Sequence, residues 1–207
     1  MMGSVSRRKG SLTASVPVSR QFLPDDWPFI FRGPSSFLYL SMLKLKGMSM
    51  KAPSFAGLKP ASQSASLAKR MNRSVDTKHE LILRKALWRR GLRFRKNDAN
   101  LPGKPDIVFV SARVAVFCDG DFWHGRNWRQ LSSQLRQRAN PDYWCKKIRA
   151  NRVRDRRITA LLAKLGWCVI RLWEKDIHAN PQNAALVVES AVRRCTQLTL
   201  QGERCAS

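Results

Sequence analysis

The sequence predicts an α/β fold in which a mixed central sheet is flanked by helices. Three observations support this fold class. Two short β-rich runs are joined by a tight turn, a long amphipathic helical segment follows them, and a buried strand comes directly after that segment. In chain order the expected elements run α-β-β-β-α-β-α. This order is typical of a mixed sheet with flanking helices.

The first helix is expected over residues 78–90. Thr77 precedes it and Glu80 lies three residues further on, which is the spacing of a capping box. Within the helix, apolar residues recur on one face, and Gly91 is a suitable helix end. The sequence therefore places the start of regular structure at Thr77.

Three strands are expected next. Residues 92–95 are a short candidate, and residues 107–110 and 114–117 are two β-rich runs separated only by residues 111–113. So short a connection predicts a hairpin. The loop that follows, over residues 119–125, reads Asp-Gly-Asp-Phe-Trp-His-Gly and carries several candidate functional groups.

The second half of the chain is dominated by one long helix. A polar connection is expected over residues 126–140, and the helix over residues 141–165, where apolar positions follow the helical period. Gly166 ends it. Residues 167–173 then form a buried strand, and a last helix covers residues 182–194.

The charge of the chain points to an anionic partner. Lys and Arg total 39 against 14 Asp and Glu, which gives a formal net charge of +25. A chain so charged repels itself unless an anionic partner is bound. Nucleic acid is the first candidate, and an anionic membrane surface is the second. The most apolar N-terminal stretch, residues 37–45, is much shorter than the ~20 residues that span a bilayer.

The N-terminal residues 1–60 differ from the rest. They show scattered Ser, Pro and Gly, no sustained periodicity and several internal methionines. They are interpreted as a disordered basic tail, or as the product of a start codon assigned too far upstream, with the true start near Met48 or Met50. One folded domain is expected over residues 61–207.

Cysteine usage and the N-terminus predict an intracellular protein. The five cysteines are irregularly spaced and form no CxxC pair, so a disulfide framework or zinc knuckle is not expected. No secretory cleavage pattern follows Met1. We expect reduced thiols and a cytoplasmic location.

Two carboxylates are candidates for a metal site. Asp106 opens the first hairpin strand and Asp119 follows the second, so the hairpin would bring them to adjacent strand ends. Their mutual repulsion would require a cation, and Mg²⁺ takes oxygen ligands of this kind. Bound Mg²⁺ could also activate water for phosphodiester cleavage. The alternative is that both are ordinary turn or strand-start residues.

Other residues of this region also allow two interpretations. His124 could act as an acid or base, or be a structural histidine. Phe122 and Trp123 could fill the core or stack against bases. Glu80 could serve the active site or only its own helix start.

The long helix carries a basic face, offset locally only by Asp142 and Asp155. A solvated surface is one interpretation, but the excess of positive charge favours contact with phosphates. The basic residues are Lys146, Lys147, Arg149, Arg152, Arg154, Arg156 and Arg157.

Several motifs, in one order over roughly residues 66 to 190, resemble a known family. They are Asp76-Thr77…Glu80, Gly91-Leu92-Arg93-Phe94-Arg95, Leu101-Pro102-Gly103-Lys104-Pro105-Asp106, the run from Ala115 to Gly125, Tyr143-Trp144…Lys147-Ile148…Asn151, Arg154-Asp155-Arg156-Arg157, and Leu165-Gly166-Trp167…Leu172-Trp173-Glu174. This set is similar to the very short patch repair (Vsr) mismatch endonucleases within the PD-(D/E)XK nuclease fold.

The resemblance implies a restriction-endonuclease-like core and an Mg²⁺-dependent DNA endonuclease. Such an enzyme nicks one strand of duplex DNA beside a T:G mismatch during repair. The alternatives are a restriction-like or mobile-element nuclease, and a DNA-binding protein without activity. It also implies double-stranded DNA as partner, mismatch-repair proteins as further partners, a monomer, and association with the nucleoid when DNA is bound.

The resemblance assigns roles to the site residues. Asp106 would be the central metal ligand and the backbone carbonyl of Cys118 another. His124 would assist the attacking water or the phosphate. Glu80 would sit near the metal, and Asp155 would support the site from the long helix.

DNA contacts are implied as well. Three aromatic side chains match those that wedge into DNA beside a mismatch, and three polar ones are expected to contact it. They are Phe122, Trp123 and Trp144, and Lys147, Asn151 and Arg154.

The chain departs from the family in two ways. The family commonly has His where this chain has Asp119, and we hypothesise that Asp119 binds the metal directly. The family also holds a structural zinc, but the corresponding positions here are Asp121, Arg126, Trp128 and Lys175. This set cannot rebuild a thiolate and imidazole site, so no zinc is expected there, and packing of Trp128 would order the loop instead. Asp119 and Asp155 could approach only with a cation or a shared proton between them.

Overall fold

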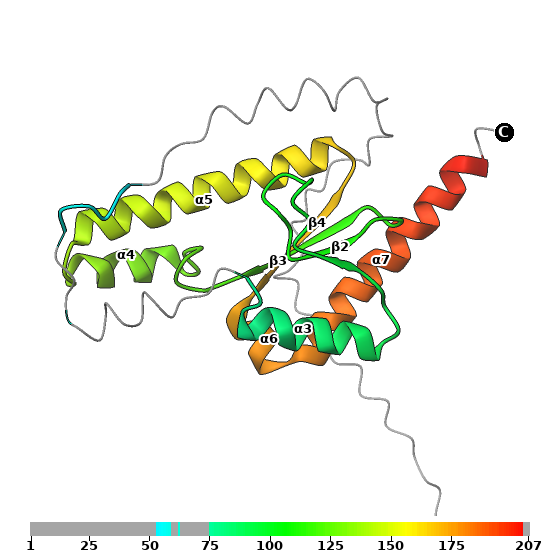
Figure 1. The fold of residues 1–207 in the computed structure, drawn as a ribbon, viewed down its shortest axis with the longest axis horizontal. Coiled ribbons are helices and arrows are strands. Elements are labelled where there is room, and N and C mark those ends of the chain that lie inside the picture. The colour runs from blue at the N-terminus through cyan, green and yellow to red at the C-terminus, as the bar shows by residue number, and fades with distance from the viewer. Residues whose placement is uncertain (1–52, 59–61, 63–74, 205–207) are drawn as a thin grey trace, which may run out of the picture. The chain divides into compact units, whose positions relative to one another are not determined.

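The computed structural model describes residues 53–58, 62 and 75–204. Most of the expected N-terminal extension, residues 1–60, lies outside the described residues, and the prediction of a tail stays untested there. The described residues contain one sheet with helices on both of its faces (Figure 1).

Nine elements follow one another along the described chain (Figure 1). They are α3 (Lys78–Arg89), β1 (Arg95–Lys96), β2 (Ile107–Phe109), β3 (Val114–Asp119), α4 (Trp128–Arg136), α5 (Pro141–Lys164), β4 (Cys168–Trp173), α6 (Glu174–Ala179) and α7 (Pro181–Arg204).

The four strands form one mixed sheet in the order β1-β2-β3-β4. β1 pairs with β2, and β2 with β3, in antiparallel fashion, whereas β3 and β4 run parallel. The predicted fold class is therefore confirmed. In this register Ile107 lies opposite Val116, and Asp119 lies opposite Trp173. β3 is paired on both edges and buried along its whole length, so it fixes the position of everything attached to its end.

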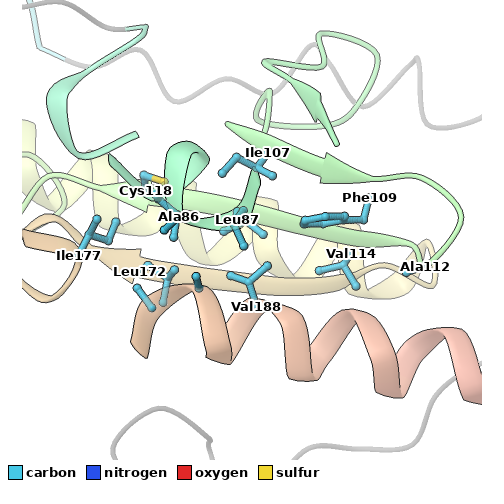
Figure 2. Packing of buried hydrophobic residues seen from close by; sticks show 14 residues of the cluster. Ala86, Leu87, Ile107, Phe109, Ala112, Val114, Cys118, Leu172, Ile177 and Val188 are labelled. Carbon is cyan, nitrogen blue, oxygen red and sulfur yellow. The ribbon is translucent and has the colours of Figure 1, made fainter. Parts of the chain in front are cut away.

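One face of the sheet packs against α3 and α7. Leu83 and Leu87 of α3 and Val188 of α7 meet Val116 and Leu172 of the sheet in the main hydrophobic cluster (Figure 2). All five side chains are almost completely buried. This cluster holds the first helix firmly against the end of the chain.

The opposite face packs against α5. Ala115 and Phe117 of β3 form a second cluster with Leu162 of α5. Because side chains alternate along a strand, Cys118 points to the α3 and α7 face and Asp119 to the α5 face. The end of β3 therefore supplies functional groups to both sides of the sheet.

Four predicted elements are confirmed to within two residues at each end: α3, the hairpin of β2 and β3, α5 and β4. Their hydrophobic periodicity is strong except in α5, where the apolar positions follow the helical period only roughly. The predicted strand over residues 92–95 is shifted, because β1 is Arg95–Lys96. The last helix starts at Pro181, as expected to within one residue, but continues to Arg204.

The expected polar connection over residues 126–140 is wrong, because α4 occupies most of it. The segment carries Trp128, Leu131 and Leu135 at helical spacing, a short signal that was overlooked among six polar residues, and Leu135 is the only residue of α4 that is buried. The sequence pattern does not predict α6. That helix is one and a half turns long and buries only Ile177.

The helix start at Thr77 is confirmed, but the capping box takes another form. Thr77 is the N-cap, yet its side chain makes no capping hydrogen bond to the helix backbone. Its hydroxyl instead donates to Glu80 Oε1 at 2.7 Å, and the Asp76 N–H donates to Glu80 Oε2 at 3.1 Å. Glu80 thus organises the turn before the helix.

Candidate active site and DNA-binding surface

Strand β3 extends beyond the start of β2, and this overhang creates a polar corner. β2 begins at Ile107 opposite Val116, so Cys118 lies past the last paired residue of β2. The Asp106 carboxylate accepts the Cys118 N–H at 2.7 Å, and His79 Nε2 lies 3.2 Å from the Cys118 carbonyl oxygen. The side chains of Asp106 and His79 therefore bond the backbone groups of Cys118 that a longer β2 would have paired.

The surroundings of the Asp106 carboxyl disfavour its ionised form. Burial raises its pKa from the usual 3.8 to about 6. The Cys118 N–H lowers the pKa, the negative charges of Glu80 and Asp119 raise it, and the Arg84 guanidinium lowers it. A cation bound at Asp106 would relieve this concentration of negative charge.

Glu80 is 3% exposed and lies beside the corner, as expected. Besides the two bonds that organise the helix start, it accepts a bond from Arg84 Nη2 at 2.9 Å. The same nitrogen of Arg84 donates to the Asp106 backbone carbonyl at 3.3 Å. Glu80 therefore organises the turn before α3, and its negative charge also raises the pKa of Asp106. A role for Glu80 in catalysis stays a prediction.

Asp119 lies on the other face of the sheet and is held by Arg171 of β4. It is 3% exposed, and its two oxygens accept bonds from Arg171 Nε at 2.6 Å and Nη2 at 2.7 Å. Arg171 Nη2 also lies 3.4 Å from an oxygen of Asp155. The cation required for Asp119 and Asp155 to approach each other is therefore this guanidinium.

His124 and Asp155 form a hydrogen-bonded pair. His124 Nδ1 lies 2.6 Å from Asp155 Oδ2 and 3.4 Å from Asp119 Oδ1. Burial raises the pKa of Asp155, but the His124 hydrogen bond and the Arg171 charge outweigh it, so that the pKa falls below its usual value. Because Nδ1 is used, Nε2 is the ring nitrogen that can meet a substrate.

An open pocket of about 430 Å³ adjoins this pair. It lies between the end of β3 and α5, and three arginines contribute to its wall. Its lining residues include Asp119, His124, Asp155, Arg152, Arg156 and Arg171. Adjacent carboxylate, imidazole and guanidinium groups are suited to a phosphodiester.

The predicted site residues thus fall into two neighbouring groups. Asp106, Glu80 and the Cys118 carbonyl form the corner, while Asp119, His124 and Asp155 gather on the α5 face. The peptide bond between Cys118 and Asp119 joins the groups. Burial, above all, raises the pKa of the Cys118 thiol well above its usual value, so the carbonyl and not the sulfur is the donor available at this position.

Residues 58–130 match the family model of the DNA mismatch endonuclease Vsr. The Type II nicking enzyme V.NmeDIP of Neisseria meningitidis serogroup C is 44% identical over 122 residues, which cover 59% of this chain and 81% of that relative. V.HpaIIP of Haemophilus parainfluenzae, also a Type II nicking enzyme, is 38% identical over 130 residues, 62% of this chain and 91% of its own length. The DNA mismatch endonuclease Vsr of Escherichia coli K12 is 38% identical over 99 residues, 48% of this chain and 62% of its own length.

The chain belongs to the Vsr endonuclease family. It is therefore a DNA endonuclease, and the resemblance found in its motifs is confirmed. The matched region contains the polar corner and the loop that carries His124. Among the described residues, no helix has both the length and the apolar character needed to cross a membrane.

In this Vsr endonuclease, ion pairs connect the loop after β3 to α6. Arg126 Nη2 lies 2.8 Å from Asp176 Oδ1, and Nη1 lies 3.5 Å from Asp121 Oδ1. The Arg126 guanidinium also lies over the Trp173 ring, 5.7 Å from its centroid. Asp121 and Arg126 are two of the positions at which the family was expected to bind zinc. Trp128, expected to order the loop, is half-buried with Arg152 over its ring.

The three aromatic residues that the resemblance predicts to wedge into DNA form one cluster. Phe122 and Trp123 lie 5.2 Å apart between ring centroids, and both lie within 6 Å of Trp144. Tyr143 and Phe55 extend the cluster. All of these rings are half-buried, so they are neither core plugs nor free stacking groups. They support one another and keep part of their surface accessible.

The helix α5 contributes both a basic surface and a buried amide. Arg154 has 56% of its side chain exposed, and Lys147 is half-buried. Asn151 is only 7% exposed, and its amide donates to the Trp123 carbonyl at 2.8 Å. This bond fixes the aromatic loop on α5, which is a positioning contact. Direct contact of Asn151 with DNA stays a prediction.

Sequence reasoning missed two residues that the structure brings into the site, His79 and Arg171. Arg171 had a signal, since it is the one charged residue in the otherwise apolar strand Cys168–Trp173. His79 had none, because a histidine at the second position of a helix is unremarkable until the overhang of β3 places a carbonyl beside it.

Removing the charge of Asp106 is expected to stabilise the metal-free protein at neutral and higher pH. The folded protein holds the Asp106 proton more tightly than the unfolded chain, so stability falls as pH rises from about 4 through about 6. Asp106→Asn should therefore unfold at higher denaturant concentration at about pH 8, by about 2–3 kcal/mol, and lose this advantage near pH 4. An exposed control, Asp142→Asn, should show little effect. A destabilised Asp106→Asn protein at pH 8 would contradict the electrostatic argument.

The loop that carries His124 should tolerate no side chain at Gly125. Both Gly125 (φ +68°) and Gly91 (φ +77°) have left-handed backbones, so each alanine variant bears a strain of about 1 kcal/mol. A Cβ at position 125 would also come within 2.8 Å of Ile148 and Arg152, whereas one at position 91 meets nothing within 4 Å. Gly125→Ala should therefore cost about 1–3 kcal/mol more than Gly91→Ala in chemical denaturation, and it alone should reduce nicking. Equal losses of stability in the two variants would refute this.

Arg126 should hold the loop against α6. Its guanidinium serves two carboxylates, whose partner is lost in Arg126→Ala. These side chains are about 30% exposed, so we expect a loss of about 1 kcal/mol, together with faster amide hydrogen exchange in the loop. Arg129→Ala, an exposed change on α4, is the control. Unchanged exchange in the loop would show that Arg126 does not order it.

Proposed function

We propose that the chain hydrolyses one strand of duplex DNA beside a T:G mismatch in an Mg²⁺-dependent reaction. The observation that carries this proposal is the polar corner at the overhang of β3, where the Asp106 carboxylate accepts the Cys118 N–H and the Cys118 carbonyl oxygen lies beside His79. The corner lies one residue from the group of Asp119, His124 and Asp155. This arrangement offers a place for a cation next to a group that can handle a proton.

The donors of the corner are suited to Mg²⁺. Asp106 uses one oxygen for the Cys118 N–H, and the bond leaves the carboxylate further lone pairs to offer. The raised pKa of Asp106 indicates a surplus of negative charge that a cation would offset. Asp106 and the Cys118 carbonyl would hold the ion, as hard oxygen ligands do. When bound, Mg²⁺ would offset charge on the phosphate and make water more acidic.

On the α5 face, Asp155 would orient His124, and His124 would transfer a proton. Asp155 holds His124 by Nδ1, so Nε2 faces the substrate side and can accept or donate a proton. Arg171 contacts both Asp119 and Asp155 and holds these two carboxylates in place. Direct metal binding by Asp119 would compete with the Arg171 guanidinium, because each oxygen of Asp119 already accepts a bond from it. The Mg²⁺ affinity of the Asp119→Ala protein tests this hypothesis, and an unchanged affinity would contradict it.

Duplex recognition would involve the aromatic cluster and the basic surface of α5. The half-buried rings of Phe122, Trp123 and Trp144 present aromatic surface beside the loop of His124. Aromatic wedges of this kind stack between bases and open a step of the duplex. The exposed arginines of α5, such as Arg154, would contact phosphates. Mismatch-repair proteins as partners, a monomeric state and a cytoplasmic location remain predictions.

A second function, that of a nicking enzyme beside a type II restriction system, is favoured by what two of the relatives are. Two relatives matched over most of their length are Type II nicking enzymes, whereas the Escherichia coli relative is a DNA mismatch endonuclease. The two functions share the chemistry of the site and differ in the DNA that is cut.

Nicking of a labelled duplex containing one T:G mismatch tests the proposal. We expect cleavage of one strand in Mg²⁺ and none in EDTA. Asp106→Asn should reduce the nicking rate at least 10³-fold, which corresponds to about 4 kcal/mol of activation free energy. His124→Asn should lose activity by about 10²–10⁴-fold, as expected for a proton-transfer group. Asp142→Asn, which changes an exposed carboxylate of α5, is the matched control.

The outcomes separate the alternatives. Equal cutting of a fully paired duplex would exclude mismatch selection and favour the restriction-like nuclease. Full activity in EDTA would overturn the metal requirement. DNA binding that depends on salt, without any cutting in any metal, would indicate a family member that binds DNA but has lost its activity.

A further inference from the structure

Three side chains converge between α3 and α6, and of these only His79 also takes part in the polar corner. They are His79 of α3, and Glu174 and His178 of α6, and one ligand atom from each lies within 4.8 Å of the others. His79 is buried, and the side chains of Glu174 and His178 are 42% and 34% exposed. The cluster thus has a fixed inner ligand and two ligands that reach it from the surface.

We propose that these three residues bind a transition-metal ion such as Zn²⁺, which joins α3 to α6. Two imidazoles and a carboxylate form a donor set that selects Zn²⁺, Cu²⁺ or Ni²⁺ over Mg²⁺. Water would take the fourth position of a tetrahedral ion. The triad shares no residue with the four positions at which the resemblance located the family's zinc, Asp121, Arg126, Trp128 and Lys175.

The spacing of the donor atoms is close to that of a metal site. His79 Nδ1 and Glu174 Oε1 are 3.7 Å apart, and Glu174 Oε1 and His178 Nε2 are 4.0 Å apart. A tetrahedral zinc with bonds of 2.0–2.1 Å places its ligand atoms about 3.4 Å from one another. Small side-chain rotations would suffice to close the site. Glu174 and His178 are four residues apart on a helix, so they lie on the same side of α6.

The hydrogen bonding of His79 gives independent support. Its Nε2 faces the Cys118 carbonyl oxygen, which can only accept, so Nε2 carries the hydrogen. In the neutral ring, Nδ1 then directs a lone pair toward the Glu174 carboxylate, and two electron-rich atoms oppose each other. A cation between them removes this conflict. Metal-binding histidines commonly donate their other N–H to a backbone carbonyl in this way.

The alternative cation is a proton on Nδ1, which would make His79 and Glu174 a simple ion pair. The gap of 3.7 Å is longer than a charge-assisted hydrogen bond of 2.7–2.9 Å. The charged groups beside the triad are the exposed Lys175 and Asp176, and the latter is bound to Arg126. Among the described residues Glu174 forms ion pairs with His79 and His178 and with no lysine or arginine, so its negative charge is available to the two imidazoles.

Cobalt titration of the full-length protein tests this site. Co²⁺ replaces Zn²⁺ in tetrahedral sites, and its visible bands report nitrogen and oxygen ligands, whereas thiolates add a strong near-ultraviolet band. We expect one Co²⁺ per chain with visible bands and no thiolate band, and displacement by Zn²⁺. The thiolate readout matters, because Cys168 and Cys195 are hydrogen-bonded neighbours and could also attract the metal.

Three variants decide the assignment. His178→Ala and Glu174→Gln change exposed groups and should fold, and each should weaken Co²⁺ binding at least tenfold. Lys175→Ala, on the same helix, should bind as wild type does. Zn²⁺ should raise the melting temperature of wild type and of Lys175→Ala but not of His178→Ala.

Either of two results would overturn the proposal. One is wild-type protein that binds no Co²⁺ or Zn²⁺, which would leave His79 and Glu174 as an ion pair. The other is binding that His178→Ala leaves intact, or that shows a thiolate band. All readouts are made without DNA or Mg²⁺, so they are independent of the proposed nicking activity.

Discussion

The whole site depends on the difference in length between β3 and its antiparallel neighbour β2. Because β3 continues past the last β2 pair, the backbone N–H and carbonyl of Cys118 need partners that a strand does not supply. Asp106 and His79 provide them. This requirement brings α3 to the end of the sheet and orients a carboxylate at the corner. The alternation of side chains then places Asp119, the next residue, on the face of α5.

Two guanidinium groups partly neutralise the carboxylates that are buried around the end of β3. Arg84 joins Glu80 to the backbone of Asp106, and Arg171 joins Asp119 to Asp155. Burying these carboxylates without such partners would be costly. Each arginine has one nitrogen without a partner in the described structure, so neither network is saturated. The carboxylates are thus neutralised in part. No side-chain cation among the described residues forms an ion pair with the Asp106 carboxylate, and burial raises its pKa.

The sequence was sufficient for the elements with strong periodicity and for the residues that lie within motifs. Helix α3, the hairpin and β4 bury apolar side chains in regular patterns, which the sequence shows. Helix α5 buries Ile148 and Leu162 with the polar Asn151 and Asp155 between them, and its apolar positions follow the helical period only roughly. Helix α4 has only three apolar residues, Trp128, Leu131 and Leu135, and their short helical pattern was overlooked, whereas α6 buries only Ile177. Asp106 and His124 stand in a recognisable order, whereas His79 and Arg171 enter the site through pairings 39 and 52 residues apart. Long-range contacts of this kind depend on strand register, which composition and local spacing do not contain.

The bidentate contact between Asp119 and Arg171 couples two positions on neighbouring strands. Losing either partner alone would leave a charge unpaired in a site where Asp119 is 3% exposed. Substitutions at these positions are therefore epistatic, and an evolving lineage would exchange them together or pass through a weakened intermediate. A relative with an imidazole at the position of Asp119 would leave the residue corresponding to Arg171 only the carboxylate of Asp155, which would weaken the requirement for an arginine there. The two positions would then covary across the family, with aspartate and arginine together in some members and an imidazole with a residue other than arginine in others.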